Sequence, residues 1–278
     1  MSGIIYIPGQ VKSTDLNDAY SNQTMLSFRD GVPVAIVKGG QDDNKIIYVD
    51  SSVQGLEQAE REYLVPFEPD GLSQGILQPL PQFNKSERCY IAAQTGAGKT
   101  YYTRKYLEQL LKVYPKKQIF VFSDVEKDPE LDVLGKNIVR FKLDDELLEK
   151  DPIKPDKFKG SVCVFDDIDS IQNPKLLKYV QTLRDAILRR GRHEDISCIV
   201  TSHLLTNYRD TRIVLNEANT ITVFCRSGST FGVKYLLQKY CGFDKSQIDQ
   251  ILKIPSRWIT IYKNHPMYIA HEKGIYLV

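Results

Sequence analysis

Apolar residues along this chain fall into two alternating patterns, which together predict an α/β fold. Short apolar runs are typical of buried strands, and apolar positions three or four apart are typical of helices. The runs predict strands at residues 88–93, 118–122, 137–141, 161–165, 197–201 and 220–224. The helical spacing predicts helices at residues 100–114, 174–190, 234–240 and 247–253. Strands that alternate with helices are joined by right-handed crossovers, so a mostly parallel sheet is expected.

Both ends of the chain depart from this alternation. Near the N-terminus, strands at residues 32–37 and 45–49 flank a polar, Gly-rich turn. Near the C-terminus, strands at residues 258–262 and 267–271 flank the turn Asn264-His265-Pro266. The sequence therefore adds a small N-terminal β element and a C-terminal hairpin to the α/β core.

A stretch rich in proline and glycine separates the N-terminal strands from the core. It covers residues 66–81 and is the part of the chain that most resembles a linker. We therefore expect residues 1–80 to form a β-containing extension with its linker, and residues 81–278 to form the main domain. Deleting residues 1–65 is expected to impair assembly and to leave nucleotide binding intact.

Composition narrows the class of protein further. The chain has 278 residues, of which 42% are hydrophobic and 26% charged, so a sizeable core can form. No apolar run approaches the roughly 18 residues of a membrane span, and the first residues lack the pattern of a signal peptide. The five cysteines are scattered without a C-x-x-C pair, which argues against a zinc ribbon or a disulfide framework. We expect reduced thiols in an intracellular compartment.

Charge is unevenly distributed along the chain, although the net charge is only +2. Residues 171–278 hold 16 basic and 8 acidic residues, a balance of +8, whereas residues 1–170 have a balance of −6. Such asymmetry favours an anionic partner for the second half, or else reflects helix faces that differ in charge.

A phosphate-binding loop lies between the first core strand and the first core helix. The segment Ala93-Gln94-Thr95-Gly96-Ala97-Gly98-Lys99-Thr100 matches the P-loop pattern, with Ala93 in place of the first glycine. Gly96 and Gly98 allow the tight turn that directs backbone N–H groups at a phosphate, and the helix N-terminus adds positive potential. Lys99 is expected to reach the β- and γ-phosphates, and Thr100 to bind Mg²⁺. The expected nucleotide-binding residues are Thr95, Gly96, Ala97, Gly98, Lys99, Thr100 and Tyr101.

A second motif follows the strand at residues 161–165. There the apolar run ends in Asp166 and Asp167, which matches the Walker B pattern. We expect Asp166 to hold Mg²⁺, mostly through water, and Asp167 to act as the general base on the attacking water. The alternative is an acidic turn after a strand. An extra strand between the P-loop strand and the Walker B strand, together with the second acid, favours a hydrolysing motor ATPase over a metabolite kinase.

Two further elements carry candidate residues. The strand at residues 197–201 ends in Ser202 and His203, either of which could contact the γ-phosphate. Before that strand stand Arg189, Arg190 and Arg192, at the end of a predicted helix. One of these arginines could reach a neighbouring subunit's γ-phosphate or a nucleic-acid backbone, although basic residues also favour a helix C-terminus in their own right.

Taken together, these motifs resemble the genome-packaging ATPases of nucleocytoplasmic large DNA viruses, the poxvirus-type branch of the FtsK/HerA superfamily. The resemblance rests on residues 93–100, Phe165-Asp166-Asp167, Gly191-Arg192-His193 and residues 199–203. It implies a RecA-like P-loop NTPase core, ATP and Mg²⁺, and a homo-oligomeric ring of five or six subunits. It implies Lys99, Asp167, Arg192 and His203 as catalytic residues and Thr100 and Asp166 at the metal. His203 stands where relatives often carry Gln.

The resemblance also implies a function and a setting. It points to an ATPase that translocates double-stranded DNA into a viral capsid, with capsid or portal-vertex proteins as partners. The expected location is the viral assembly site in the host cytoplasm, or the virion. Two alternatives remain open, a P-loop enzyme of another class such as a small-molecule kinase, and a nucleotide-gated scaffold without turnover.

Overall fold

The structure is a computed structural model. It describes residues 4–6, 32–40, 43–44, 46–49, 65–67, 75–81, 86–149, 152–207, 209–264, 267–272 and 274–277. The turn at His265 and Pro266 therefore lies outside the described residues, as does most of the chain before residue 75.

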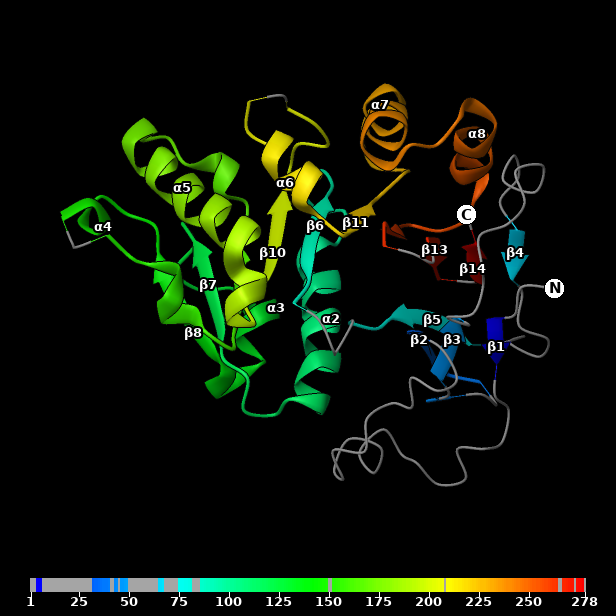
Figure 1. The fold of residues 1–278 in the computed structure, drawn as a ribbon, viewed down its shortest axis with the longest axis horizontal. Helices are drawn as coiled ribbons and strands as arrows, with labels where there is room; N and C mark the ends of the chain where they lie inside the picture. Colours follow the sequence, from blue (N-terminus) through cyan, green and yellow to red (C-terminus); the bar gives the residue numbers. More distant parts are fainter. Residues whose placement is uncertain are drawn as a thin grey trace.

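A ten-stranded sheet forms the centre of the fold (Figure 1). Its strands are β4 (Val65–Phe67), β6 (Arg88–Ala92), β7 (Ile119–Ser123), β8 (Ile138–Lys142), β9 (Val162–Phe165), β10 (Ser197–Ser202), β11 (Thr220–Val223), β12 (Ile259–Tyr262), β13 (Tyr268–His271) and β14 (Gly274–Leu277). They lie in the order β4-β14-β13-β12-β11-β6-β10-β9-β7-β8. The six from β11 to β8 pair in parallel, and the other four pair antiparallel.

This arrangement confirms the expected α/β fold class with a mostly parallel sheet. The C-terminal hairpin is present as β12 and β13, which pair antiparallel. It does not stand apart from the core, because β12 also pairs with β11 and β14 continues the antiparallel series. The Pro/Gly-rich stretch expected to be a linker contains β4, which pairs with β14, and a further strand, β5 (Ile76–Pro79).

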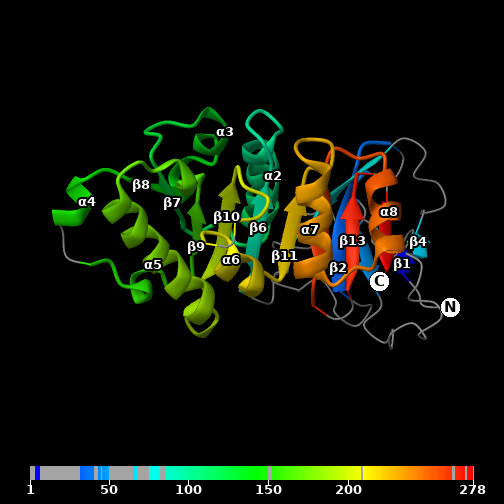
Figure 2. The ribbon, with the colours of Figure 1, turned by 90° about the horizontal axis from the view of Figure 1, so that it is seen from above.

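Helices cover both faces of the sheet (Figures 1 and 2). The helices are α2 (Lys99–Val113), α3 (Pro129–Asp132), α4 (Glu146–Glu149), α5 (Pro174–Arg190), α6 (Arg212–Glu217), α7 (Thr230–Cys241) and α8 (Lys245–Lys253). Successive side chains of a strand point to opposite faces. In β6, Tyr90 packs in the core beneath α5, α6, α7 and α8, whereas Ile91 packs in the core shared with α2. The sheet is therefore buried on both sides, as a parallel sheet requires.

The sequence of α5 shows why this helix begins where it does and which face it buries. The side chain of Asn173 accepts a hydrogen bond from the backbone N–H of Lys175, and Pro174 occupies the first helical turn. Apolar residues at Leu176, Val180, Leu183 and Ile187 form one buried face against the sheet.

A second, four-stranded antiparallel sheet lies beside α2, below the antiparallel part of the main sheet in Figure 1. Its strands are β1 (Ile4–Tyr6), β2 (Val32–Lys38), β3 (Ile46–Val49) and β5, in the order β1-β3-β2-β5. The two strands expected near the N-terminus correspond to β2 and β3. Residues of β2, β3 and β5 share one buried cluster with Tyr262, Tyr268 and Ile275 of the main sheet.

Within the described residues, no helix combines the length and the apolar character that crossing a membrane requires.

Candidate functional site

The loop between β6 and α2 has the geometry of a phosphate-binding loop. Gly96 and Gly98 have φ angles of +78° and +105°, a region that glycine adopts without strain. Gly98 is the N-cap of α2 and makes no side-chain cap, and the first turn of the helix carries no acidic residue. The first N–H groups of a 15-residue helix therefore face the loop without a side-chain acceptor, as an anion site requires.

Lys99 is the best-placed cation at this loop. Its side chain is only 6% exposed, and its Nζ donates a hydrogen bond to the Ala93 carbonyl at 3.0 Å. The same Nζ lies 2.9 Å from Nδ1 of His203 and 3.5 Å from Oδ1 of Asp167. An ammonium group held this way faces the end of the loop where a terminal phosphate would lie.

The two acids expected from the sequence follow β9 directly. One hydroxyl group ties them together, because Thr201 Oγ1 lies 2.8 Å from Asp166 Oδ1 and 3.3 Å from Asp167 Oδ1. Ser123 Oγ, at the end of β7, lies 3.4 Å from Asp166 Oδ2. The carboxylates thus reach the site from the ends of parallel strands, at the edge where ligands of such sheets bind.

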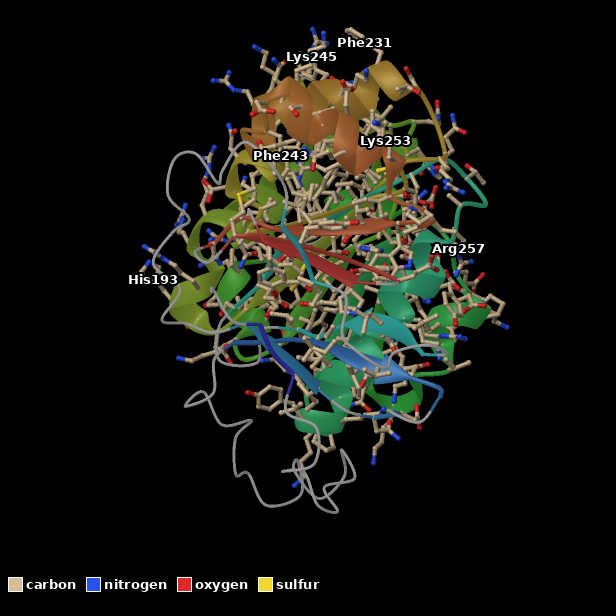
Figure 3. The ribbon with its side chains drawn as sticks, turned by 90° about the vertical axis from the view of Figure 1, so that its right-hand side faces the viewer. His193, Phe231, Phe243, Lys245, Lys253 and Arg257 are labelled. Carbon is tan, nitrogen blue, oxygen red and sulfur yellow. The ribbon has the colours of Figure 1, made fainter. Side chains whose placement is uncertain are left out.

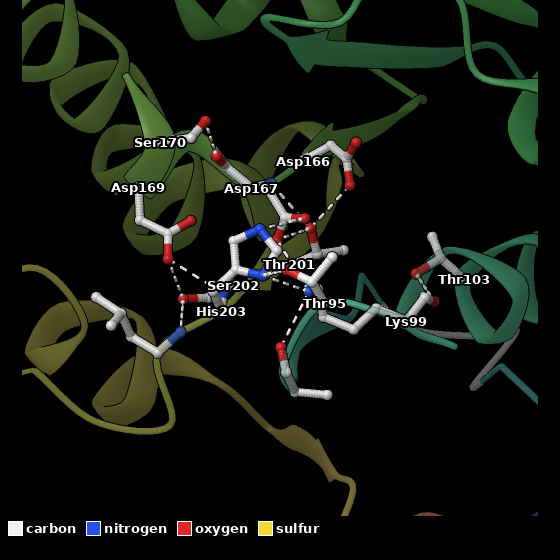
Figure 4. A network of polar contacts seen from close by, with 12 residues as sticks. Thr95, Lys99, Thr103, Asp166, Asp167, Asp169, Ser170, Thr201, Ser202 and His203 are labelled. Atoms are coloured by element: carbon white, nitrogen blue, oxygen red, sulfur yellow. Dashed lines mark hydrogen bonds and ion pairs between the residues drawn. The ribbon is translucent and has the colours of Figure 1, made fainter. Parts of the chain in front are cut away.

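Asp167 has a backbone conformation that is uncommon for a residue with a side chain. Its φ is +45° and ψ is +40°, in the left-handed region. Its backbone N–H donates to Thr201 Oγ1 at 2.9 Å, which holds the turn in place. Such conformations cost on the order of 1–3 kcal/mol and concentrate at functional sites. Here the turn directs the Asp167 carboxylate toward Lys99 and His203 (Figure 4).

His203 joins the cation and the acid. Its Nδ1 faces Lys99 Nζ at 2.9 Å, and its Nε2 faces Asp167 Oδ2 at 3.1 Å. An ammonium group has no lone pair, so Nδ1 must accept from Lys99 and the ring proton lies on Nε2, which donates to Asp167. Thr95 Oγ1 lies 3.4 Å from the same Nδ1. The side chains of Lys99, His203 and Asp167 therefore form one connected row.

Burial dominates the ionisation of both acids. It raises the pKa of Asp166, and the hydrogen bond from Thr201 only partly opposes it. Burial also raises the pKa of Asp167, while the Lys99 ammonium group and the neighbouring His203 ring lower it. A divalent cation beside these oxygens would favour their charged forms.

The donor set fits Mg²⁺. This ion prefers carboxylate and hydroxyl oxygens, and it keeps several waters while bound through one or two carboxylates and the substrate's phosphates. Asp166, which is 8% exposed, offers a buried carboxylate at the site, and Thr100 follows Lys99 on α2. The described residues contain no group of three or more His, Cys, Asp or Glu side chains that could hold a metal without a substrate.

Sequence reasoning missed three members of this network. Thr201 interrupts an apolar strand with a hydroxyl group, and Ser123 ends another buried strand. A polar residue within or at the end of an apolar run was the feature of the sequence that could have identified both. Asp169 accepts hydrogen bonds from Ser202 Oγ at 3.0 Å and from the His203 backbone N–H at 3.1 Å. The acid therefore fixes the end of β10 and with it the position of His203. Ser202 points to Asp169 and not to the P-loop lysine.

Arg192 does not lie with the other predicted site residues. It is exposed in the 3₁₀ turn η5 (Gly191–Glu194), which precedes β10, whereas His203 follows β10. Five residue steps along this strand span roughly 16 Å. The neighbouring His193 reaches the surface in Figure 3. Arg192 therefore lies at the opposite edge of the sheet from Lys99, out of reach of its own chain's site.

The remaining predicted residues lie at the rim. Ala97 and Gly98 are partly exposed, and Tyr101 is 47% exposed with the Arg104 guanidinium 5.0 Å from its ring centre. The P-loop follows β6, the acids follow β9, and β10 lies between these two strands. The strand at residues 118–122, which lies between the two motifs in the sequence, is β7 and pairs on the far side of β9. The order of the strands matches a P-loop NTPase fold.

Comparison with other proteins gives the family. The chain is 38% identical over 256 residues to the uncharacterized protein V3 of Sputnik virophage, which covers 90% of this chain and 98% of that protein. The chain belongs to the same family as that virophage protein. No protein-family model matches the chain.

Several solved structures are similar at low identity. The genome-packaging NTPase B204 of Sulfolobus turreted icosahedral virus 2, in complex with AMPPCP, aligns with a TM-score of 0.45 and 15% identity, over 67% of this chain and 97% of that one. The pCW3 conjugation coupling protein TcpA aligns with a TM-score of 0.49 and 13% identity, over 92% of this chain and 81% of that one. A viral packaging NTPase, the kind of protein that the sequence motifs resemble, is thus among the similar structures.

Proposed function

We propose that this chain is an ATP-hydrolysing translocase that packages double-stranded viral DNA into a capsid. The observation that carries the hydrolytic part is the row Lys99–His203–Asp167 at the end of a P-loop. Phosphate binding needs only the loop and its lysine. A second acid, held in a left-handed turn beside that lysine, adds a base at the point where a water would attack.

In this proposal each residue has one task. The loop N–H groups and Lys99 bind the β- and γ-phosphates, while Thr100 and Asp166 hold Mg²⁺. When bound, the cation would neutralise charge on the phosphate oxygens. Lys99 now contacts His203, so an arriving γ-phosphate would compete for its ammonium group. That exchange would release His203 to contact the phosphate and leave Asp167 free to take a proton from water.

The packaging part of the proposal rests on the resemblance of the motifs. The net charge of +8 in residues 171–278 supports an anionic partner, and the exposure of Arg192 at the far edge of the sheet supports a role toward a neighbouring subunit. We propose a homo-oligomeric ring that acts with capsid or portal-vertex proteins, at the viral assembly site or in the virion.

Steady-state ATP hydrolysis, measured with and without linear duplex DNA at low salt, tests this function. We expect DNA to stimulate turnover cooperatively with protein concentration. Lys99→Ala and Asp167→Asn should each lower turnover at least a hundredfold, because one removes phosphate charge stabilisation and the other removes the base. A matched control is Asp156→Asn, an exposed acid outside the network around Asp166 and Asp167.

Other outcomes would contradict the proposal in different places. A turnover rate that depends neither on DNA nor on protein concentration would contradict the proposal of a DNA-translocating ring. Phosphoryl transfer to a metabolite in place of water would favour a kinase. Tight ATP binding without turnover under every condition would favour a nucleotide-gated scaffold.

A further inference from the structure

A cavity of about 540 Å³ continues from the phosphate-binding loop along the side of α2. Gly96, Ala97 and Gly98 of the loop line it, and one wall is formed by residues of α2 between Tyr101 and Lys112. The opposite wall is β5, which belongs to the small N-terminal sheet. The volume lies within the range of small-molecule sites.

The cavity floor is aromatic. Tyr102, Phe224 and Trp258 line it and pack edge to face, with ring centres 6.5 Å apart for Tyr102–Phe224 and 5.2 Å apart for Tyr102–Trp258. Each of the three side chains is at most 8% exposed. A floor of this kind suits a flat, aromatic ligand better than an extended anion.

Two amide groups in the cavity walls bond to each other, and each leaves one polar atom without a partner. Gln109 on α2 is 2% exposed, and its Nε2 donates to Gln78 Oε1 on β5 at 3.3 Å. Among the described residues, nothing bonds Gln109 Oε1 or Gln78 Nε2, although both atoms are buried. Buried polar atoms are normally satisfied, so a spare acceptor beside a spare donor calls for a ligand that offers the complement.

We infer that this cavity binds the adenosine part of the nucleotide, with the N-terminal sheet supplying one wall. The inference rests on the proposed function, since the triphosphate at the P-loop would direct the nucleoside into the cavity. Gln109 Oε1 would accept from the 6-amino group of adenine, and Gln78 Nε2 would donate to the adjacent ring nitrogen. The aromatic floor would contact the base.

Positive charge at the same cavity is the one feature that suits a different ligand. Lys105 and Lys112 line it with Lys38, whose pKa is lowered by burial and by the charge of Lys112. Lys105 is paired with Glu108 at 2.8 Å, and Lys38 donates to Asn44 Oδ1 at 2.6 Å. Two of the three ammonium groups thus have acceptors already, which leaves the aromatic floor and the amides as the features without a function.

Trp258 makes the inference directly measurable, because it is the only tryptophan in the chain. We would titrate the full chain with Mg²⁺-ATP and with Mg²⁺-tripolyphosphate while following tryptophan fluorescence, and measure the binding of both by calorimetry. ATP is expected to change the emission. Tripolyphosphate is expected to bind at the P-loop and leave the emission unchanged, because it has no base to reach the floor.

A second comparison tests the amides. Purine riboside triphosphate lacks the 6-amino group, so the full chain should bind it about fivefold more weakly than ATP, the effect of one hydrogen bond. Gln109→Met keeps the side-chain volume and removes the acceptor, so it should bind both nucleotides equally and tripolyphosphate as before. Gln172→Met, an exposed glutamine on the chain before α5, should keep the fivefold preference.

The outcomes separate this inference from the proposed function. Fluorescence that ATP does not change, with ATP bound and hydrolysed, would overturn the cavity assignment alone. An equal response to tripolyphosphate would mean that the cavity takes an anion through its lysines, and equal binding of the two nucleotides by the full chain would remove the amides' role. ATP that changes the emission and is not hydrolysed would support the cavity and overturn the ATPase.

Discussion

Asp166 carries a charge where the surrounding protein disfavours one. Burial raises its pKa, so the folded chain binds a proton on this group more readily than the unfolded chain does. Its effect on stability therefore has a definite sign. The contribution of Asp166 to the free energy of unfolding is most favourable below the pKa that its carboxyl group has in the unfolded chain. It falls as pH rises through the higher pKa of the folded state. At neutral pH the ionised carboxylate works against folding.

We predict that Asp166→Asn stabilises the free protein while it abolishes Mg²⁺-dependent hydrolysis. The amide can still accept from Thr201 and can donate to Ser123, so both neighbours keep a partner. Thermal unfolding at pH 7 should shift upward by about 2–4 °C, the change that 1 kcal/mol gives in a protein near this size. The gain should shrink at pH 4, where the wild-type carboxyl group is more protonated.

Asp156→Asn is the control for this comparison, because Asp156 is exposed and outside the site. It should leave the unfolding temperature unchanged at both pH values. A lower unfolding temperature for Asp166→Asn at pH 7 would contradict the prediction, and would mean that the contacts of the carboxylate outweigh its burial.

At the scale of elements, the connection α5–η5–β10 separates two predicted catalytic residues. Helix α5 runs back to the starting edge of β10, where Gly191 packs tightly against Ile196 and allows the 3₁₀ turn. Arg192 therefore lies at that edge, before β10, and His203 lies at the opposite edge, directly after β10.

We predict that Arg192 acts only on a neighbouring subunit's nucleotide. Arg192→Ala should lower turnover at least a hundredfold and keep ATP binding, since arginines in this role are worth 10³ or more. Mixing Arg192→Ala with Lys99→Ala should restore measurable hydrolysis, because an intact site can then meet an intact arginine. The readout is turnover of the mixture against each variant alone.

Lys159→Ala is the matched control, since Lys159 is an exposed cation whose Nζ pairs with Glu194 at the same turn. It should hydrolyse ATP normally without mixing. If the mixture of the two inactive variants stays inactive, Arg192 has a structural role or acts on DNA.

Elements with strong local signals were predictable from the sequence. The span of α5 matches the expected residues 174–190, where an N-cap, a proline and a helical apolar spacing coincide. The first four residues of α7 were missed, because Gly232 lies among them and weakens the helical pattern. Strand β5 was missed because Pro79 and its neighbours look like linker, and only pairing with β2 makes it a strand.

The candidate site likewise contains residues that the sequence predicts and residues that only the fold brings together. The loop and the two acids follow from spacing along the chain, since each motif ends a strand. The contacts of Thr201 and Asp169 depend on β10 lying between β6 and β9, which is a property of strand order. The aromatic floor of the cavity joins residues 102, 224 and 258, and no local pattern connects them.

At the scale of the whole molecule, the small N-terminal sheet and the main sheet share one core. Val34, Val37 and Ile47 are fully buried in a cluster with Tyr262 and Tyr268 of the main sheet. The two tyrosine rings stack with centres 4.2 Å apart. Removing the N-terminal strands would expose this surface, so the two parts of the chain are expected to unfold together.

We predict that deleting residues 1–65 destabilises the entire chain. The deletion removes β2 and β3, and each large apolar side chain lost from a core typically costs about 2–5 kcal/mol. Residues 66–278 should unfold at least 10 °C below the full chain, or fail to give a cooperative transition by calorimetry. The earlier expectation that nucleotide binding survives this deletion therefore applies only to whatever fraction folds.

A shorter deletion, of residues 1–30, serves as the control because it keeps β2, β3 and β5. It should retain a cooperative transition close to that of the full chain. Equal unfolding temperatures for the full chain and residues 66–278 would show that the N-terminal sheet is thermodynamically independent.

The separation of Arg192 from Lys99 also limits the symmetry of any active assembly. If an arginine on one edge of the sheet serves a site on the opposite edge of the next copy, the contact joins two different surfaces of the chain. A two-fold dimer satisfies this contact for both subunits only if its self-complementary interface includes both edges, whereas a head-to-tail contact closes into a ring or continues as a helical filament. All subunits of that ring face the same way, which gives it two unlike faces. A duplex that threads such a ring would therefore enter by one face and leave by a different one.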